Sequence, residues 1–309
     1  MRPSPRAAAL LGACCLAFSG IFFRFSGASP STATVFRCLY ALPLLLALGA
    51  WEDRRYGGRS RRDRLVCLLA GIFFAVDLLT WQHSVVAVGA GLATVLANMS
   101  VLGVGLAGWL LLGERPTGRM FAGLVLVLAG AILISGVADR GAYGADPPLG
   151  VVFGLSAAAA YAGYLLLVRH GNPGGRHPFG ALFDASLAAA ATAAIVGIGV
   201  GDVRFDPYWP AHGWLLLVAF TSQVVGYGLV NFSLPHLPAV LTSILLLLQP
   251  AMTLLFAAIL LAEAPSPLQL GGVALVMGGV AVAAARRRRG PGEPTGERVV
   301  PAVILPAVD

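Results

Sequence analysis

The stretch LLGERPTGRMFAGLVLVLAGAIL begins at Leu111, and a second stretch, LLAEAPSPLQLGGVALVMGGVAV, repeats its pattern from Leu260. The two align at a fixed offset of 149 residues, which pairs Glu114 with Glu263, Pro116 with Pro265, Gly123 with Gly272 and Gly130 with Gly279. Each copy closes a block of five apolar runs. Because five is odd, the second block must enter a membrane from the opposite side, which predicts inverted repeats of the kind found in secondary transporters.

Ten apolar runs fill the 309-residue chain, and each is about long enough to cross a bilayer as a helix. We therefore predict an all-α, polytopic membrane protein with ten transmembrane helices in two inverted five-helix repeats, residues 1–138 and 148–285. The tail, 286–309, is rich in Pro and Gly and is predicted to be disordered. The runs are Ala7 to Phe25, Ser31 to Trp51, Leu65 to His83, Ala87 to Gly113, Arg119 to Val137, Leu149 to Val168, Phe179 to Val200, Trp214 to Leu234, Pro238 to Leu261 and Leu268 to Ala285.

The arginines predict the orientation. The chain has 21 basic residues and all are Arg. With ten spans, 17 of them lie at the termini and in the loops on one side, and only Arg140 and Arg204 lie in loops on the other. By the positive-inside rule the richer side, with both termini, is the cytoplasm, and the membrane is the inner membrane of a bacterial cell. The dispersed charge predicts no nucleic-acid partner.

The N-terminal segment has the basic start and apolar core of a signal peptide. Because its apolar run continues through Phe22 and Phe23 and nine more runs follow, we interpret it as an uncleaved first span. Four cysteines, Cys14, Cys15, Cys38 and Cys67, fall in or beside predicted spans without metal-ligand spacing, so they are predicted to be packing residues.

Three stretches resemble the EamA-type transporters of the drug/metabolite transporter superfamily. SGIFFRFSGASPSTATVFRCLYA resembles the family's opening, DLLTWQHS with ATVLANMSVL its third and fourth spans, and LPHLPAVLTSILLLLQPAMTLLFAAILLAEAPSPLQLGG its ninth. The motif positions are occupied by Arg24, Pro30, Arg37, Asp77, Trp81, Ser84, Thr94, Asn98, Gln249, Pro250 and Glu263. Val101 stands where a proline like Pro250 is usual. The resemblance covers most of 11–285 and implies a central cavity lined by helices one, three, four, six, eight and nine.

Three charges are predicted inside the outer half of the membrane. Arg37 and Asp77 lie at comparable depths in the second and third spans, roughly 10 Å from the outer surface, and Arg24 lies near the outer end of the first. One interpretation is an Arg37–Asp77 ion pair that ties two helices together, with Arg24 reaching the headgroups. The other is a surplus guanidinium that binds the carboxylate of an amino acid or a similar anion.

Several spans carry polar side chains on one helical face. In the eighth, Gln223, Tyr227 and Asn231 follow at i, i+4 and i+8. The other members of the predicted cavity are Asp77 with Trp81, Thr94 with Asn98, and Thr242, Gln249 and Thr253 around Pro250. Each of these residues can instead support packing through an interhelical hydrogen bond. Tyr161 and Tyr164 on the sixth span are candidates to stack on a substrate ring, or are core residues.

Other residues are assigned structural roles. Glu114 and Glu263 at helix ends, and the glycines at 123, 130, 272 and 279, are predicted to let helices start and approach closely. Asp184 is predicted to reach headgroup water or to pair with an Arg. His83 and His236 lack a second ligand, so no metal or other cofactor is predicted.

The patterns together predict a carrier that exports a small metabolite or amino-acid-like solute by alternating access. The sequence leaves open whether transport is coupled to protons. Asp77 is the one carboxylate predicted to lie deep enough in the membrane to bind a coupling proton, and an ion pair with Arg37 would keep it from titrating near neutral pH. The alternatives are an importer of a nucleoside, cofactor or osmolyte and, in another class, an intramembrane lipid-modifying enzyme or flippase. The sequence contains no ATP-binding glycine loop with Lys, and the oligomeric state is open.

Overall fold

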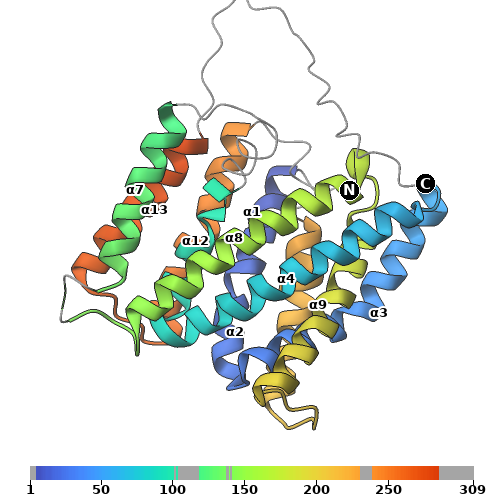
Figure 1. The fold of residues 1–309 in the computed structure, drawn as a ribbon, viewed down its shortest axis with the longest axis horizontal. Coiled ribbons are helices and arrows are strands. Elements are labelled where there is room, and N and C mark those ends of the chain that lie inside the picture. Colours follow the sequence, from blue (N-terminus) through green and yellow to red (C-terminus); the bar gives the residue numbers. More distant parts are fainter. Residues whose placement is uncertain are drawn as a thin grey trace, which may run out of the picture.

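A computed structural model describes residues 5–100, 102–103, 118–136, 139, 141–229 and 239–284. Within these ranges every regular element is helical and none is a strand. In Figure 1, α4 and α8 cross the bundle, α7 and α13 lie at one side of it, and α3 and α9 lie at the other. The elements are α1 (Pro5–Ala17), α2 (Ser19–Ser26), α3 (Pro30–Tyr56), α4 (Arg61–Val88), α5 (Ala90–Ala97), α7 (Gly118–Ile134), α8 (Pro147–Gly171), η1 (Pro173–Gly175), α9 (Pro178–Val200), α10 (Ala211–Leu217), η2 (Val218–Gly226), α12 (Ala239–Leu260) and α13 (Pro267–Ala284).

Four helices are long and apolar enough to cross a bilayer, namely α3, α4, α8 and α9. They correspond to the second, third, sixth and seventh predicted spans. Four shorter apolar helices accompany them in the described ranges, over Leu10–Ser26, Gly118–Ile134, Leu248–Leu260 and Pro267–Val282. In the described ranges, therefore, four of the ten expected spans have the length and composition needed to cross a bilayer.

Local sequence signals explain where the long helices begin. Ser29 caps α3, because its hydroxyl accepts a hydrogen bond from the Thr32 N–H at 3.3 Å, and Pro30 occupies the first helical position. Ser60 caps α4 through the Asp63 N–H at 3.1 Å. These caps place the helix starts a few residues before the apolar runs, so each helix extends beyond the hydrophobic stretch that predicted it.

Two predicted spans are not regular α-helices. The first is divided at Phe18 into α1 and α2. The eighth begins as α10 and continues as the nine-residue π-helix η2, which contains Gln223. A π-helix closes its hydrogen bonds between residues five apart, so side chains rotate away from the stripe that α-helical spacing predicts, and such segments are frequent at functional sites.

The helices α3 and α9 run antiparallel and are tied together at both ends by carboxylates. Glu52 near the end of α3 accepts hydrogen bonds from the backbone N–H groups of Phe179 at 3.1 Å and Gly180 at 2.9 Å, at the start of α9. Asp202 just after α9 accepts one from the Ser31 N–H at 3.4 Å, at the start of α3. A negative charge at a helix N-terminus is favourable, because unpaired N–H groups and the helix dipole meet there.

A third carboxylate ties the start of α5. Glu263 accepts hydrogen bonds from the Ala90 N–H at 2.6 Å and the Gly91 N–H at 3.0 Å. A Cβ atom on Gly89, whose φ is +92°, would lie 2.8 Å from the Glu263 carboxylate. Glycine is required at this position both for its backbone conformation and for the close approach of the carboxylate.

Glycines bring α7 and α13 into backbone contact. A Cβ atom on Gly130 would lie 2.6 Å from the carbonyl oxygen of Gly272, and one on Gly279 would lie 2.8 Å from that of Gly123. The pairing of Gly130 with Gly272 and of Gly123 with Gly279 requires the two helices to run antiparallel. Small residues at a helix interface permit this approach in a membrane, where van der Waals packing supplies much of the attraction.

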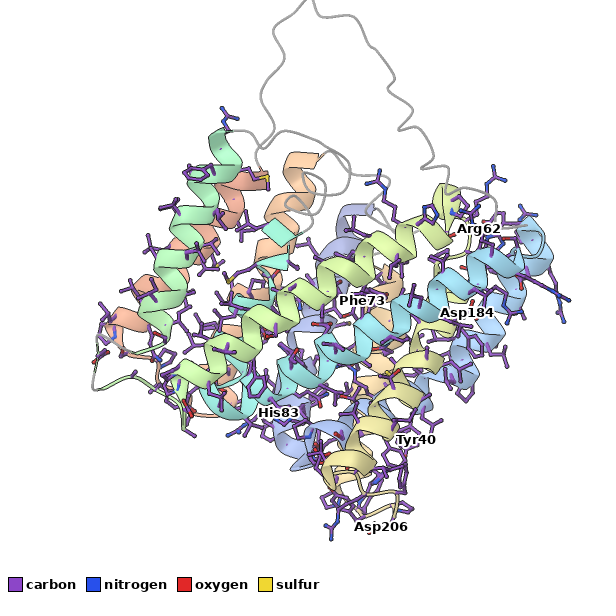
Figure 2. All side chains as sticks on the ribbon, in the orientation of Figure 1. Tyr40, Arg62, Phe73, His83, Asp184 and Asp206 are labelled. Carbon is purple, nitrogen blue, oxygen red and sulfur yellow. The ribbon has the colours of Figure 1, made fainter. Side chains whose placement is uncertain are left out.

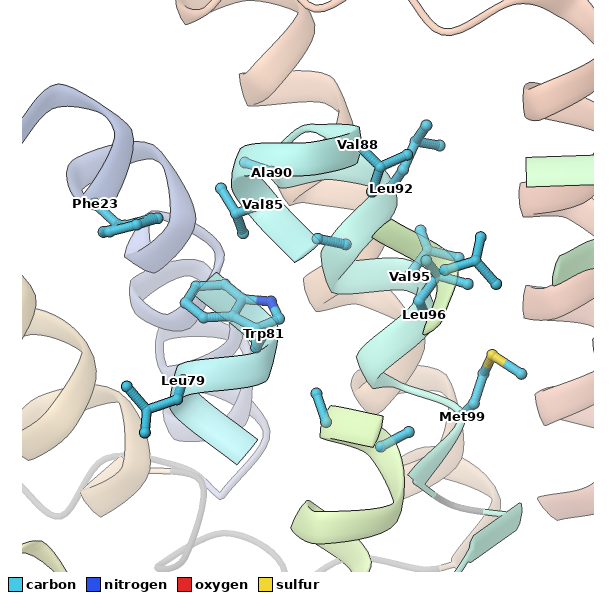
Figure 3. Packing of buried hydrophobic residues seen from close by; sticks show 14 of the residues in the cluster. Phe23, Leu79, Trp81, Val85, Val88, Ala90, Leu92, Val95, Leu96 and Met99 are labelled. Carbon is cyan, nitrogen blue, oxygen red and sulfur yellow. The ribbon is translucent and has the colours of Figure 1, made fainter. Parts of the chain in front are cut away.

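Buried apolar side chains form two clusters. The first surrounds Trp81 and reaches from α2 to α7 and α13, and Figure 3 shows Trp81 among Phe23, Leu79 and Val85. The second surrounds Phe74 and joins α3, α4, α8, α9 and η2. The second cluster also holds the polar groups described next.

Candidate functional site

A chain of buried polar side chains connects three helices at the second cluster. Arg37 on α3 is 2% exposed, and its Nη2 donates a hydrogen bond to Oε1 of Gln223 on η2 at 3.2 Å. Gln223 in turn donates from Nε2 to the hydroxyl of Ser186 on α9 at 3.0 Å. Because an arginine is always charged, this network buries a positive charge that a neutral amide only partly satisfies.

Asp77 on α4 lies near Arg37 without forming an ion pair with it. The carboxylate is buried and interacts electrostatically with Arg37 and with Tyr227, yet no Arg37–Asp77 ion pair occurs within the described residues. The Nε of Arg37 is buried and has no hydrogen-bond partner. The ion pair considered from the sequence is thus not formed within the described residues, and one nitrogen of the Arg37 guanidinium has no partner there.

Aromatic rings from three segments stand beside these charges. Phe74 stacks on Tyr164 at a centroid distance of 4.6 Å, and Tyr164 stacks on Tyr161 at 5.5 Å. Tyr227, just after η2, meets Phe74 edge-on at 5.9 Å. Tyr161, Tyr164, Tyr227 and Asp77 are close enough to interact electrostatically. We call Arg37, Asp77, Gln223, Tyr161 and Tyr227 the charged-aromatic site.

This arrangement suits recognition of a small zwitterion. A guanidinium with an open N–H binds a carboxylate by charge-assisted hydrogen bonds, and a carboxylate that is not paired with it can accept from an ammonium group. The tyrosines add ring faces and hydroxyl groups for the rest of such a molecule. The chemistry available is binding and orientation of a charged small molecule.

Other predicted cavity residues are engaged within or between helices. The Thr94 hydroxyl donates to the Ala90 carbonyl at 2.8 Å, and the Asn98 amide donates to the Thr94 carbonyl at 2.8 Å, both within their own helical segment. The Thr253 hydroxyl contacts the carbonyls of Ala17 at 3.2 Å and Gln249 at 3.0 Å. Only the Thr253–Ala17 bond joins two helices, as the packing interpretation expects, whereas the bonds of Thr94 and Asn98 stay within one helical segment.

The remaining predicted residues take varied positions. Trp81 lies in the first apolar cluster, where a Cβ on Gly20 would be 3.4 Å from its ring. Arg24 is exposed near the end of α2, and Pro250 lies inside α12 without dividing it. Asn231 and Glu114, and the side chain of Thr242, lie outside the described residues.

Asp184 pairs with arginines and does not reach headgroup water. Its side chain is 1% exposed and forms ion pairs with Arg59 Nη2 at 2.8 Å and Arg64 Nη2 at 3.7 Å. Figure 2 shows Asp184 toward the same end of the bundle as Arg62, whereas Tyr40 lies toward the opposite end with Asp206. Of the two interpretations from sequence, the paired one is right and exposure to headgroup water is wrong, because Arg59 folds over the carboxylate.

Two residues in the polar networks were missed from the sequence. The hydrogen bond of Ser186 to Gln223 could not be predicted, because a lone serine in an alanine-rich helix does not indicate its partner. His212 was passed over because it adjoins the predicted start of the eighth span, yet its ring is 4% exposed and bonded to Tyr40. Within the described residues, no group of three His, Cys, Asp or Glu side chains is placed to hold a metal ion.

The comparison with protein families agrees with this architecture. The model of the EamA-like transporter family matches the chain twice, over residues 6–136 and 148–285. The chain belongs to the EamA-like transporter family. An EamA-like protein is a membrane transporter, so the charged-aromatic site lies in a protein that moves a small molecule across a lipid bilayer.

Solved structures resemble this EamA-like protein in fold. One, described as "Crystal structure of protein", has a TM-score of 0.58 and 19% sequence identity, and the match covers 92% of this chain and 97% of that one. At this identity the likeness concerns the fold alone. No curated protein matches the chain.

Proposed function

We propose that this EamA-like protein is a secondary transporter that exports an amino-acid-like zwitterion from the cytoplasm by alternating access. The observation that carries the proposal is Arg37, a buried guanidinium with an unpartnered Nε that stands near Asp77 without pairing with it. A buried charge without full compensation is costly. A substrate that brings a carboxylate to Arg37 and an ammonium to Asp77 satisfies both groups at once.

Alternating access requires two halves of opposite sidedness, and the contacts between α7 and α13 support this part of the proposal. Exchanging each residue with its partner 149 positions away turns the contact of Gly123 with Gly279 into the contact of Gly272 with Gly130. A contact set that maps onto itself is what a two-fold axis produces. Because the two helices are antiparallel, the two-fold axis that exchanges them is perpendicular to both. For helices that cross a bilayer, such an axis lies in the membrane plane.

The ties between α3 and α9 support the same symmetry. Glu52 near the end of α3 binds N–H groups at the start of α9, and Asp202 just after α9 binds an N–H group at the start of α3. By the offset of 149 the exact counterpart of Asp202 is Asp53, so the two ties correspond to within one residue. Ten spans in two inverted repeats, with both termini in the cytoplasm, would place the Glu52 tie on the cytoplasmic side and the Asp202 tie on the outer side.

The test separates the two charges of the substrate. Purified protein is screened by thermal shift against a panel of L-amino acids, the matching amino-acid amides, which lack the carboxylate, and the matching des-amino acids, which lack the ammonium. We expect an amino acid to raise the melting temperature and both analogues to do so less, because a ligand that binds the folded state stabilises it.

Two variants assign the charges, and one serves as a control. Arg37→Gln should weaken binding of the amino acid by about tenfold or more, since a hydrogen bond to a charged group is worth about 1.5–3 kcal/mol, while binding of the amide changes little. Asp77→Asn should do the same for the ammonium. Arg24→Gln, at an exposed arginine, should leave the response unchanged. An unaltered response of Arg37→Gln to the amino acid would refute the proposal.

A further inference from the structure

A histidine outside the charged-aromatic site is buried at the start of α10. The ring of His212 meets Phe36 edge-on at a centroid distance of 4.4 Å, Tyr208 at 5.4 Å and Tyr40 at 6.0 Å. The residue is 4% exposed. Three aromatic rings thus enclose an imidazole at the end of the bundle that also carries Asp202. We call Asp202, His212 and Tyr40 the Asp202 end.

The imidazole makes one polar contact, and it links the two halves of the chain. Nδ1 lies 2.6 Å from the hydroxyl of Tyr40 on α3, a residue 172 positions earlier. Nε2 is buried and has no hydrogen-bond partner. A buried polar atom without a partner costs free energy, so its presence in a folded protein needs an explanation.

Among the described residues, no carboxylate is paired with His212. The elements packed against α10 are α2, α3 and η2. The charged or titratable groups on these elements at this end, and in the connection from α9 to α10, are Arg24, Arg37, Cys38, Tyr40, Asp202, Arg204, Asp206 and Tyr208. None of the carboxylates forms an ion pair with His212 within the described residues. Arg204 lies over the Tyr208 ring at 6.0 Å, which adds a positive charge.

These contacts leave a protonated imidazole without an acceptor for its second N–H while this end is closed. A protonated ring carries N–H groups at both nitrogens and a full charge, whichever tautomer the neutral ring adopts. With the end closed, one of those N–H groups has no acceptor and the charge has no partner, which is unfavourable in an apolar enclosure. Parting α3 from α10 would let water reach Nε2 and solvate the cation.

We propose that His212 is a proton-binding site whose protonation opens the Asp202 end. A proton from water adds to the free lone pair of the imidazole, and the resulting cation is stable in the open form. By linkage, a proton that binds the open form better shifts the population toward it. Resting on the proposed function, in which this end faces outward, a proton taken up from outside would hold the carrier open toward the outside, and its release to the outside would let this end close again.

The experiment measures opening directly and needs no transported solute. Hydrogen–deuterium exchange of the full chain in nanodiscs is followed by mass spectrometry between pD 8 and 5, with rates corrected for the chemical pH dependence of exchange. The peptides of interest cover residues 29–40 and 202–215. We expect their protection to fall as the pD is lowered, by at most about tenfold for each pH unit because one proton is bound, while peptides over residues 52–64 do not respond.

Three variants make the outcome decisive. His212→Gln, which cannot take up a proton in this range, should abolish the pH response, whereas His83→Gln, at another histidine that stacks on an aromatic ring, should retain it. Tyr40→Phe removes the hydroxyl and keeps the imidazole, so it should lower protection at every pH and preserve the response. A flat wild-type profile, or an undiminished response in His212→Gln, would overturn the proposal.

The two proposals fail separately. If no amino acid stabilises the protein but the exchange response is present and depends on His212, the substrate assignment is wrong and the proton site stands. If His212→Gln proves too unstable to purify, the profiles of wild type, His83→Gln and Tyr40→Phe still decide: a response that is absent from the wild type or lost in Tyr40→Phe contradicts the proposal.

Discussion

The two ends of the α3–α9 pair are closed by different chemistry. At the Glu52 end, which comprises Glu52, Arg59 and Asp184, a buried ion pair of 2.8 Å stands beside two charge-assisted hydrogen bonds. At the Asp202 end, the hydroxyl groups of Ser29 and Thr32 donate to the Asp202 carbonyl, the Arg204 N–H donates to Thr32 at 2.9 Å, and the Ser31 N–H donates to the Asp202 carboxylate at 3.4 Å. Tyr40 on α3 also contacts His212 on α10. The described residues contain no ion pair at this end.

This difference concerns how easily each end opens. Opening the Glu52 end must break charge-assisted hydrogen bonds and an ion pair, whereas most of the contacts at the Asp202 end are hydrogen bonds between neutral groups, which are roughly half as strong. We therefore expect the Asp202 end to open more readily, and to do so in response to protons. In a carrier, ends of unequal strength set which side the unloaded protein faces.

The largest expected effect comes from breaking the ion pair at the Glu52 end. In Asp184→Asn, the guanidinium of Arg59, 7% exposed, keeps its charge and loses its counter-charge. An unpaired buried charge typically costs about 3–5 kcal/mol. We expect a clear fall in the melting temperature of the detergent-purified protein.

Asp53→Asn is the matched control, because its carboxylate lies in the same region, is 48% exposed and is 3.7 Å from His177. Its loss should change stability by about 0.5 kcal/mol or less. If Asp184→Asn and Asp53→Asn had the same melting temperature, the Arg59–Asp184 ion pair would not stabilise the Glu52 end, and the contrast between the two ends would disappear.

The next effect tests the symmetry that makes the two ends comparable. Gly272→Ala places a methyl group 2.6 Å from the Gly130 carbonyl, so α7 and α13 must separate, at a cost of about 1–3 kcal/mol. The adjacent Gly271 has open space around its Cβ position. Gly271→Ala should therefore be neutral or slightly stabilising, since Ala favours helix by about 1 kcal/mol over Gly.

The same thermal melts read out both glycine variants. The repeat also predicts that Gly123→Ala, at the equivalent position in the first half, has an effect equal to that of Gly272→Ala. Unequal effects, with Gly123→Ala behaving like Gly271→Ala, would show that the contacts of α7 and α13 do not map onto one another.

Much of the fold was predictable, because apolar length and helix caps act locally. The four long helices lie at the runs that predicted them, and the glycine spacing at 123, 130, 272 and 279 forms the expected close contact. The π-helix was not predictable, since hydrogen bonds between residues five apart leave no pattern in composition. The break at Phe18 was missed for a similar reason: no Pro or Gly stands at that residue.

The candidate site was less accessible to sequence reasoning, because depth in a membrane can be read from a sequence but facing direction cannot. Arg37 and Asp77 were correctly placed close together, yet the partner of Arg37 is Gln223, brought toward it on the π-helix. Thr94 and Asn98 have the helical spacing of a cavity face, and both bond to their own helix instead. Short polar side chains satisfy themselves locally whenever a carbonyl one turn back is free.

A smaller effect extends the comparison to the repeated glutamates. Glu263→Gln keeps the size of the side chain but removes the charge that the Ala90 and Gly91 N–H groups meet at the start of α5. Loss of a charged cap costs about 1–2 kcal/mol. By the repeat, Glu114→Gln should cost the same, because α12 begins at Ala239, 149 residues after Ala90. A melting temperature lowered by one substitution and untouched by the other would limit the symmetry to the glycine contact.

The smallest expected effect comes from neutralising the two carboxylates that tie α3 to α9, and it tests directly which end is held more firmly. Glu52 accepts two hydrogen bonds of 3.1 and 2.9 Å, whereas Asp202 accepts one of 3.4 Å through Oδ2 and has a buried Oδ1 without a partner. Glu52→Gln should therefore cost about 1 kcal/mol, and Asp202→Asn about 0.5 kcal/mol or less, because neutralising a poorly satisfied carboxylate also removes its desolvation penalty. Thermal melts of both variants give the order. If Asp202→Asn proved the more damaging, the Asp202 end would be the firmer one, and the proton-driven opening proposed for it would have to act against the stronger contact.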